Sequence, residues 1–230
     1  AANLTATKVD AFAPGGDVNG DGLFQPGDTI LYTVTLQNVG DVNLTGVTFS
    51  DIEDPNTTLG AVNVSPLALN DIYTAQGNTL LEVGVTHGAF PAAQISGGVL
   101  GNDVEFLGDT FTLASFNSLS TSGGTVAMNA NGSFTYLPAV GFTGVDTFTY
   151  TITDKGLDGI AGNGDDLTSV GTVSITVQGV DGTSTATAPV IWYIDSNYAG
   201  ANGASDGRST RPFTSLAEVT GATGPDGAGD

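Results

Sequence analysis

Apolar and polar residues alternate along several stretches of the sequence, and this period of two is the feature that most restricts the fold. Between Ile30 and Leu36 every second residue is apolar, with Thr at most of the positions between them. Such alternation places one face of a β-strand in a core and the other toward solvent. The same pattern recurs at 134–136, 148–152 and 173–177. Glycine accounts for 34 of the 230 residues, about twice its ordinary share, which predicts tight turns. The sequence therefore predicts an all-β fold and disfavours helix-rich classes.

The chain is strongly acidic, since 24 Asp and Glu against 4 Lys and Arg give a formal net charge of −20. This charge repels phosphate backbones and anionic lipid, so we expect no nucleic-acid partner and no membrane insertion. No apolar run reaches the ~20 residues of a membrane span. Cysteine is absent and there is a single histidine, which argues against disulfides, zinc sites and Ser-His catalysis. These features fit an extracellular, cell-surface setting, where divalent cations neutralise carboxylates.

The first block, residues 1–66, contains about four predicted strands, at Leu4–Phe12, 29–36, Leu44–Phe49 and Thr57–Val64. An immunoglobulin-like sandwich uses about seven strands, so this block leaves sheet edges open. We expect another segment to complete it. The candidates are the second domain, an upstream module, or strand complementation by a neighbouring subunit.

Two motifs of this block resemble a known repeat. They are the run from Pro26 to Gly40 and the run Leu44-Thr45-Gly46-Val47-Thr48-Phe49-Ser50-Asp51. Both resemble the conserved repeat domain, of unknown function, that occurs in tandem in bacterial cell-surface proteins. The resemblance implies a short immunoglobulin-like spacer at the cell exterior.

The second block, residues 67–180, contains about eight predicted strands, with a hairpin turn of the Asn-Gly kind at 129–132. Its motifs are Val99-Leu100-Gly101-Asn102-Asp103, Gly124-Thr125-Val126, Asn131 to Pro138 and Gly144 to Tyr150. These motifs resemble the cadherin-like bacterial immunoglobulin repeat of giant adhesins. The resemblance implies a calcium-stiffened β-sandwich, one of many in a stalk.

The last block follows a Thr-, Ser- and Ala-rich linker at 181–189, which its composition predicts to be flexible. Residues 190–230 begin with a predicted strand at Ile191–Asp195 and include a predicted short helix at Leu216–Val219. The Trp-Tyr strand and the Pro-Phe-x-x-Leu segment are similar to the opening coil of right-handed parallel β-helix proteins. About forty residues cannot close a solenoid, which needs several stacked repeats. We therefore expect a β-helix-like segment that is truncated, disordered at its end, or completed by another chain.

The loop from Asp17 to Asp28 has the oxygen spacing of a calcium loop. Calcium takes six to eight oxygen ligands, and the pattern needs side-chain oxygens at positions 1, 3 and 5, glycine at 6, a backbone carbonyl at 7 and a carboxylate at 12. The residues that meet it are Asp17, Asn19, Asp21, Leu23 through its carbonyl, and Asp28, which replaces the usual Glu. The alternative is a polar turn that opens the next strand.

Two further acidic groups are candidate Ca²⁺ ligands. A loop between two strong strands carries Asp154, Asp158, Asn163, Asp165 and Asp166, whose carboxylates repel one another unless they are solvated or bridged by a cation. The alternative is a flexible, solvated hairpin. The resemblance to cadherin-like modules implies a third set at the module junction, made of Asp71, Asp103 and Asp109. The alternative there is turn and cap residues without metal.

The remaining candidates favour structural roles. His87 is expected to be a solvated turn residue. Trp192, Tyr193 and Tyr198 suit stacking on a sugar, yet aromatic residues on a strand more often belong to a core. Arg208 and Arg211 are the two neighbouring cations, and we expect an internal salt bridge with Asp195 or Asp206 rather than a bound carboxylate.

The sequence therefore predicts a non-catalytic, calcium-stabilised structural segment of a secreted bacterial surface adhesin stalk or extracellular filament. One alternative is the non-catalytic N-terminal part of a carbohydrate-active β-helix enzyme. Another is a carbohydrate-binding module. The expected partners are neighbouring modules or subunits of the same surface protein, with cell-surface glycans as a further candidate.

Overall fold

The computed structural model describes residues 3–39, 47, 56–60, 62–85, 92–106 and 110–220. The chain divides into two compact units, Ala1–Leu59 and Gly60–Asp230. The described elements are β-strands apart from one turn of 3-10 helix and a five-residue α-helix, α1 (Leu216–Thr220). No helix in this part of the chain is long and apolar enough to cross a membrane. The predicted all-β class is confirmed.

The first unit is built on a two-stranded antiparallel sheet of β1 (Leu4–Phe12) and β2 (Ile30–Asn38). Phe12 pairs with Ile30 at one end of the register, and the ring of Phe24 from the connecting loop packs 4.5 Å from that of Phe12. The strand predicted at Leu44–Phe49 lies almost wholly outside the described residues. The strand predicted at Thr57–Val64 is wrong, because the described residues there form no ladder.

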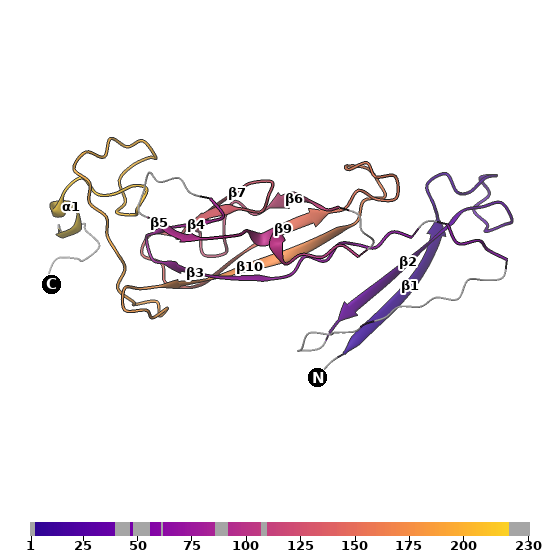
Figure 1. The fold of residues 1–230 in the computed structure, drawn as a ribbon, viewed down its shortest axis with the longest axis horizontal. Coiled ribbons are helices and arrows are strands. Elements are labelled where there is room, and N and C mark those ends of the chain that lie inside the picture. Colours follow the sequence, from indigo (N-terminus) through magenta and orange to yellow (C-terminus); the bar gives the residue numbers. More distant parts are fainter. Residues whose placement is uncertain are drawn as a thin grey trace. The chain divides into compact units, whose positions relative to one another are not determined.

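The second unit contains two four-stranded sheets, with the strand orders β3-β10-β9-β6 and β5-β4-β8-β7 (Figure 1). Their eight strands agree with the number predicted for this block. The elements are β3 (Asp71–Gln76), β4 (Leu80–Val83), β5 (Ala92–Ile95), the 3-10 turn η1 (Val99–Gly101), β6 (Thr112–Phe116), β7 (Thr125–Met128), β8 (Phe134–Leu137), β9 (Gly144–Thr153) and β10 (Thr168–Gln178).

The core lies between these two sheets and follows from the alternation in β9 and β10. Phe148, Tyr150 and Ile152 point inward from β9, and Val173, Ile175 and Val177 do so from β10. The ring of Phe134 makes edge contacts with Tyr73 at 5.2 Å and with Phe148 at 5.4 Å. Burial of this inward set gives the sandwich its hydrophobic stabilisation.

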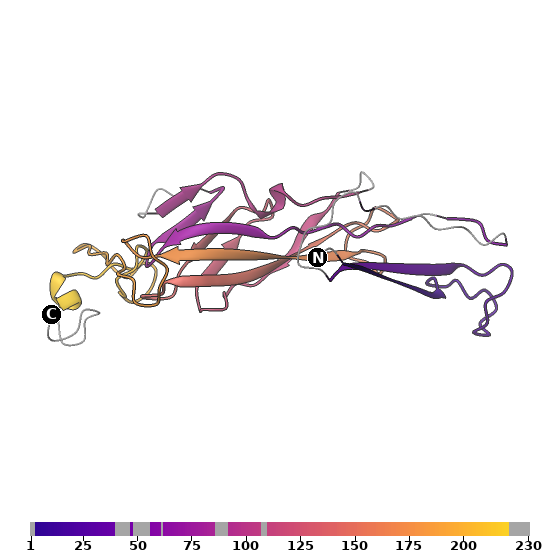
Figure 2. The same ribbon diagram turned by 90° about the horizontal axis from the view of Figure 1, so that it is seen from below.

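The first and last strands of the sandwich are neighbours. β3 pairs with β10 in parallel, from Asp71 opposite Val173 to Gln76 opposite Gln178. In Figure 2, β3, β10 and β9 run side by side. A parallel pair needs a long crossover connection, and here it is supplied by all the strands between β3 and β10.

Residues after β10 fold back onto the end of the sandwich. The predicted linker is held by backbone hydrogen bonds from Gly179 N to Thr183 O at 2.7 Å and from Val180 N to Pro189 O at 2.8 Å. Beyond it, the segment 190–213, which we call the strap, packs on the turn after β3. Asn78 Nδ2 donates to the Ile191 carbonyl at 3.0 Å.

Only part of the expected structure forms inside the strap. The strand predicted at Ile191–Asp195 is reduced to a single bridge between Ile194 and Phe213. Its backbone bonds are divided between the Gly207 and Phe213 backbone of the strap and the Asn78 side chain of the sandwich. The short predicted helix is confirmed as α1. The β-helix that the segment resembles stays a prediction.

Candidate functional site

Two acidic side chains meet at the open edge between the sheets. Asp71 is the first residue of β3 and faces the interior, as Tyr73 and Ala75 do further along the strand. Asp103 follows η1 and is tied to the chain ahead of β3, because Leu69 N donates to Asp103 Oδ1 at 2.8 Å. Tyr150, from the centre of β9, places its hydroxyl oxygen 2.9 Å from Asp103 Oδ1. The topology therefore brings three distant segments together here.

The absence of a side chain at Gly171 leaves room for the Tyr150 ring. Gly171 lies opposite Tyr150 in the β9–β10 ladder. A Cβ atom at Gly171 would lie 2.4 Å from the Tyr150 ring, so only glycine leaves room for the ring. This close approach lets the hydroxyl reach the acidic pair at the edge.

The site has more acceptors than donors. The Tyr150 hydroxyl oxygen is also 2.9 Å from the Leu69 carbonyl and 3.3 Å from the Val99 carbonyl, yet a phenol has one proton to donate. Asp71 Oδ2 and Asp103 Oδ2 are both buried and accept no hydrogen bond from the described residues. An unsatisfied buried carboxylate oxygen is costly, and a hard cation binds such oxygens.

The pKa values of these three side chains are raised mainly by burial. Burial, together with the nearby Asp103 charge, raises the pKa of Asp71 to about 6, although the Tyr150 and Asn102 side chains oppose the shift. Burial also raises the pKa of Asp103. The pKa of Tyr150 is raised by burial and by both carboxylates. Burial is the largest cause of all three shifts, so the folded chain disfavours the charged form of each group.

The loop from Asp17 to Asp28 is closed by its own carboxylates. Asp17 Oδ1 accepts from Gly20 N at 2.7 Å and Asp17 Oδ2 from Gly22 N at 2.9 Å, while Asp28 accepts from Val18 N and Gln25 N. Asn19 and Asp21 are bonded to each other through Asn19 Nδ2. Leu23 donates its N–H to Asp21 Oδ1. The five predicted ligands thus share one folded loop, and calcium binding there stays a prediction.

In the acidic loop between β9 and β10, each carboxylate accepts hydrogen bonds from a different part of the loop. Asp154 is fully buried, and its Oδ1 accepts from Gly156 N and Leu167 N. Asp158 bonds Asn163 through its Oδ2, and Asp165 Oδ2 accepts from Leu157 N. Asp154 Oδ2 and Asp166 Oδ1 are buried without a partner among the described residues.

In the part of the chain that the structure describes, no group of three His, Cys, Asp or Glu side chains gathers as a metal site. Asp71 and Asp103 are brought together as a pair of acids. Their predicted companion Asp109 lies outside the described residues, as His87 does. Ca²⁺ therefore stays a prediction at all three sites.

A fully buried carboxylate that sequence reasoning missed lies on the core side of β9. Asp146 accepts from the Tyr136 hydroxyl at 2.7 Å, the Thr121 hydroxyl at 2.9 Å and Ser122 N at 2.8 Å, and also from the Ser120 hydroxyl. Burial raises its pKa, but these donors outweigh burial and hold the pKa below its usual value. The signal was an acid at an inward position of an alternating strand.

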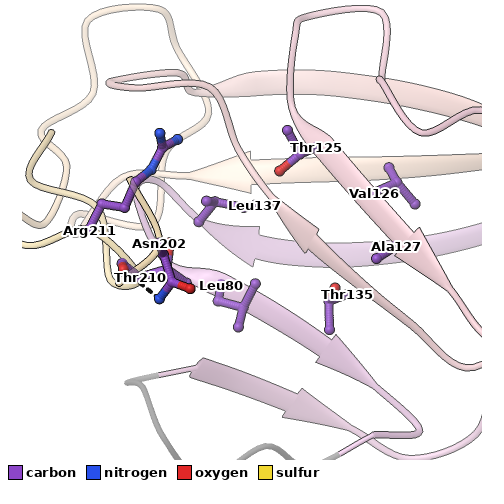
Figure 3. Close-up of a pocket in the computed structure, with 9 residues that line it drawn as sticks. All are labelled: Leu80, Thr125, Val126, Ala127, Thr135, Leu137, Asn202, Thr210 and Arg211. Atoms are coloured by element: carbon purple, nitrogen blue, oxygen red, sulfur yellow. Dashed lines mark hydrogen bonds between the residues drawn. The ribbon is translucent and has the colours of Figure 1, made fainter. Parts of the chain in front are cut away.

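The strap overhangs a groove of about 370 Å³ on the outer face of the second sheet (Figure 3). Its lining includes Leu80, Thr125, Ala127, Thr135 and Leu137 from the strands, with Asn202, Thr210 and Arg211 from the strap. Arg211 Nε lies 3.1 Å and Arg208 Nη2 2.7 Å from Asp206 Oδ2. The internal salt bridge is confirmed, with Asp206 rather than Asp195 as the partner.

The aromatic residues of the strap pack internally. The Trp192 ring stacks on Phe213 at 5.8 Å, the Tyr193 hydroxyl is 2.8 Å from Thr79 Oγ1, and the Tyr198 hydroxyl donates to the Gly203 carbonyl. These contacts agree with the expected structural role. Glycan binding stays a prediction.

Comparison with protein families identifies the second unit. The family model for the bacterial cadherin-like domain matches residues 63–179, just over half of the 230 residues, and the match spans every strand from β3 to β10. No curated protein matches the chain. The cadherin-like resemblance is confirmed, whereas the repeat of the first block stays a prediction. By this match, the chain belongs to the bacterial cadherin-like domain family.

Proposed function

We propose that the chain is a load-bearing, non-catalytic spacer of a secreted bacterial surface protein, in an adhesin stalk or an extracellular filament. Bacterial cadherin-like domains are typical of extracellular surface proteins, which supports this setting. The observation that carries the proposal is the parallel pairing of β3 with β10, the first and last strands of the sandwich.

The chain enters the sandwich beside the start of β10. Asn63 Nδ2 donates to the Asp165 carbonyl at 3.0 Å, Ser65 Oγ to the Thr168 carbonyl at 3.1 Å, and Ala68 N to Ser169 Oγ at 3.0 Å. The chain leaves from the other end of β10, where Gly77 N still donates to the Gln178 carbonyl at 2.8 Å. The entering segment is therefore bonded along the whole length of the exit strand.

Tension on the two ends of this unit acts along β3 and β10 in opposite directions. The bonds between the strands lie across the direction of pull, so they share the load and must break together. Strands that are peeled from one end lose their bonds one at a time, at a lower force. A spacer that holds its length under tension benefits from the first arrangement, since forced unfolding depends on the unfolding barrier.

Single-molecule pulling on the full chain tests this function, and the natural absence of cysteine makes specific handles simple. Handles at V62C and V180C load β3 against β10 in shear. Handles at V140C and V180C share one attachment point but peel β9 from β10. We expect a clearly higher unfolding force for the first pair. Equal forces for the two pairs would remove the load-bearing role.

The second part of the proposal is that Ca²⁺ binds between Asp71 and Asp103. The unpartnered Oδ2 atoms of both residues, the Leu69 carbonyl and the Asn102 side chain would hold the ion. A bound cation neutralises the two carboxylates and removes their mutual repulsion. The bound ion then links the start of β3 to the segment after η1, which stiffens the edge where the load enters.

Calcium titration of the D71N and D103N variants tests this site. At a free concentration of 100 times the Kd, one site adds about 2.7 kcal/mol to the free energy of unfolding. We expect each variant to lose one bound equivalent and most of this stabilisation. Terbium, which replaces calcium, should show luminescence sensitised by Tyr150 that D71N abolishes.

The same variants should behave differently once calcium is chelated. Because Asp71 carries a raised pKa, D71N removes an unfavourable charge and should equal or exceed the wild type in stability in chelator. D10N, on the exposed β1, is the matched control and should keep the wild-type response. If D71N is equally destabilised with calcium and with chelator, the pair is a structural contact and the metal proposal is wrong.

A further inference from the structure

The outer surface of the β3-β10-β9-β6 sheet has an unusual composition. We define the hydroxyl face as every second residue of β9 from Val145 to Thr153 and of β10 from Thr168 to Gln178, with their outward neighbours on β3 and β6. Across the ladder, Thr153 lies opposite Thr168, and Thr149 opposite Thr172. On β9 the inward residues between these are buried, so the hydroxyls line the outside.

No outward side chain of these four strands is charged. The chain as a whole carries 24 acidic residues and a net charge of −20, so two copies repel each other over most approaches. At physiological salt the Debye length is about 8 Å, and only charges near a contact then oppose it. The hydroxyl face is therefore a surface by which two copies can approach with little repulsion.

The face is also complementary to itself. A threonine or serine hydroxyl both donates and accepts a hydrogen bond, and the amides of Gln76 and Gln178 do the same. A surface of donors alone or of acceptors alone cannot form hydrogen bonds with an identical surface. The hydroxyl face carries both donors and acceptors, so it can bond to its own copy. A twofold interface requires this, because the same patch serves both subunits.

Exposed apolar side chains and sheet area make the contact large enough to form. Ile72 is 82 %, Val145 62 % and Val170 59 % exposed, and burying such groups is favourable. With strands about 4.8 Å apart and a rise of about 3.3 Å per residue, the four strands cover roughly 500 Å². Two copies would then bury about 1,000 Å², the lower bound for a specific interface.

We propose that two copies of this chain associate through their hydroxyl faces, sheet on sheet, about a twofold axis near Thr149 and Thr172. Packed sheets lie about 10 Å apart with their strands about 30° from alignment. The small area predicts a weak, concentration-dependent dimer. This dimer depends on neither the load path nor the calcium site, so either proposal can fail without the other.

Sedimentation of the full chain tests the dimer first by its salt dependence. The mass should rise from 23.0 kDa toward twice that value with concentration, and dimer formation should strengthen as NaCl increases from about 20 to about 300 mM, because salt screens the residual repulsion. An interface made by ion pairs would weaken instead. A chain that stays monomeric at all salts up to about 0.5 mM protein overturns the proposal.

Charge substitution then locates the contact. T149D or T149K places like charges across the twofold axis and should raise the dimer Kd at least tenfold, while an equal mixture of the two should restore a dimer. T125D and T125K, on the outer side of β7 in the other sheet, are matched controls and should leave the Kd unchanged. A dimer that survives T149D, with the sandwich folded by circular dichroism, overturns the proposed face.

Discussion

The Tyr136 hydroxyl donates a 2.7 Å hydrogen bond to Oδ2 of Asp146, and both side chains are completely buried. Asp146 has no cationic partner among the described residues. Its charge is held by hydroxyls and backbone N–H groups that join β8, β9 and the loop before β7. A hydrogen bond to a charged acceptor of this kind is stronger than one between two neutral groups.

Replacing Tyr136 with Phe should therefore lower the free energy of unfolding by about 1.5–3 kcal/mol, the usual worth of a hydrogen bond to a charged group. Urea unfolding measures the loss. Y198F removes an exposed bond to a neutral carbonyl and should cost less than about 1 kcal/mol. Equal losses of stability in Y136F and Y198F would contradict the claim that the bond to the charged Asp146 is the stronger one.

The Asp71–Asp103 pair predicts a pH dependence in calcium-free buffer. The pKa of Asp71 is raised from 3.8 to about 6 in the folded chain, so between these values the folded state binds more protons than the unfolded state. Stability then falls as pH rises through this window. Unfolding near pH 4 and near pH 7 should show a decrease that is smaller in D71N. A wild-type and a D71N protein with the same pH profile would contradict this assignment.

Gly171 should be intolerant of a side chain. In G171A the new methyl group meets the Tyr150 ring at 2.4 Å, so the ring and its hydroxyl must move away from Asp103. We expect a loss of about 2 kcal/mol or more, together with weaker terbium luminescence. Gly164 has open space around it, and G164A should change neither quantity.

The strap should stabilise the sandwich through Ser209. Leu80 N donates to Ser209 Oγ at 2.8 Å in a buried position, and S209A leaves that N–H without its acceptor. The expected cost is about 1–3 kcal/mol, with faster hydrogen exchange at the Leu80 amide. S196A, at an exposed site, is the control. Unchanged exchange at Leu80 would show that the strap is not closed over the turn in solution.

The Asp17–Asp28 loop should bind one calcium ion if its ligand pattern is functional. The double variant D17A/D21A removes two carboxylates and should lose one bound equivalent by calorimetry. D10A in the same unit should keep it. An unchanged stoichiometry in the double variant would leave the loop as a polar turn closed by its own hydrogen bonds.

Local patterns predicted the local structure well. Alternation placed β1 at Leu4–Phe12 with its observed bounds, and the Asn-Gly turn joins β7 to β8, with Gly132 at a φ of 79°. These features depend on residues close in sequence. The strand predicted at Ile191–Asp195 is only a single bridge. Its Ile191 carbonyl accepts from Asn78, more than a hundred residues away, and its other backbone bonds go to Gly207 and Phe213, partners that no local pattern reveals.

The candidate site was predicted in outline only. Asp71 and Asp103 came from a family resemblance, and the sequence contained no sign that Tyr150 would bring its hydroxyl between them. Likewise Asp146 stands in a clear alternating strand, but its donors Tyr136 and Ser120 belong to other elements. Hydrogen bonds between strands depend on register across the whole sheet, so they emerge only from the fold.

The parallel pairing of β3 and β10 has a consequence for how proteins of this kind change length. Because the chain enters this unit at one end of β10 and leaves it at the other, each added copy of the unit contributes its long dimension. A gene that gains or loses such a unit by recombination lengthens or shortens its product by a fixed step. The length of such a protein can therefore change through the number of its units, while the core of each unit stays the same.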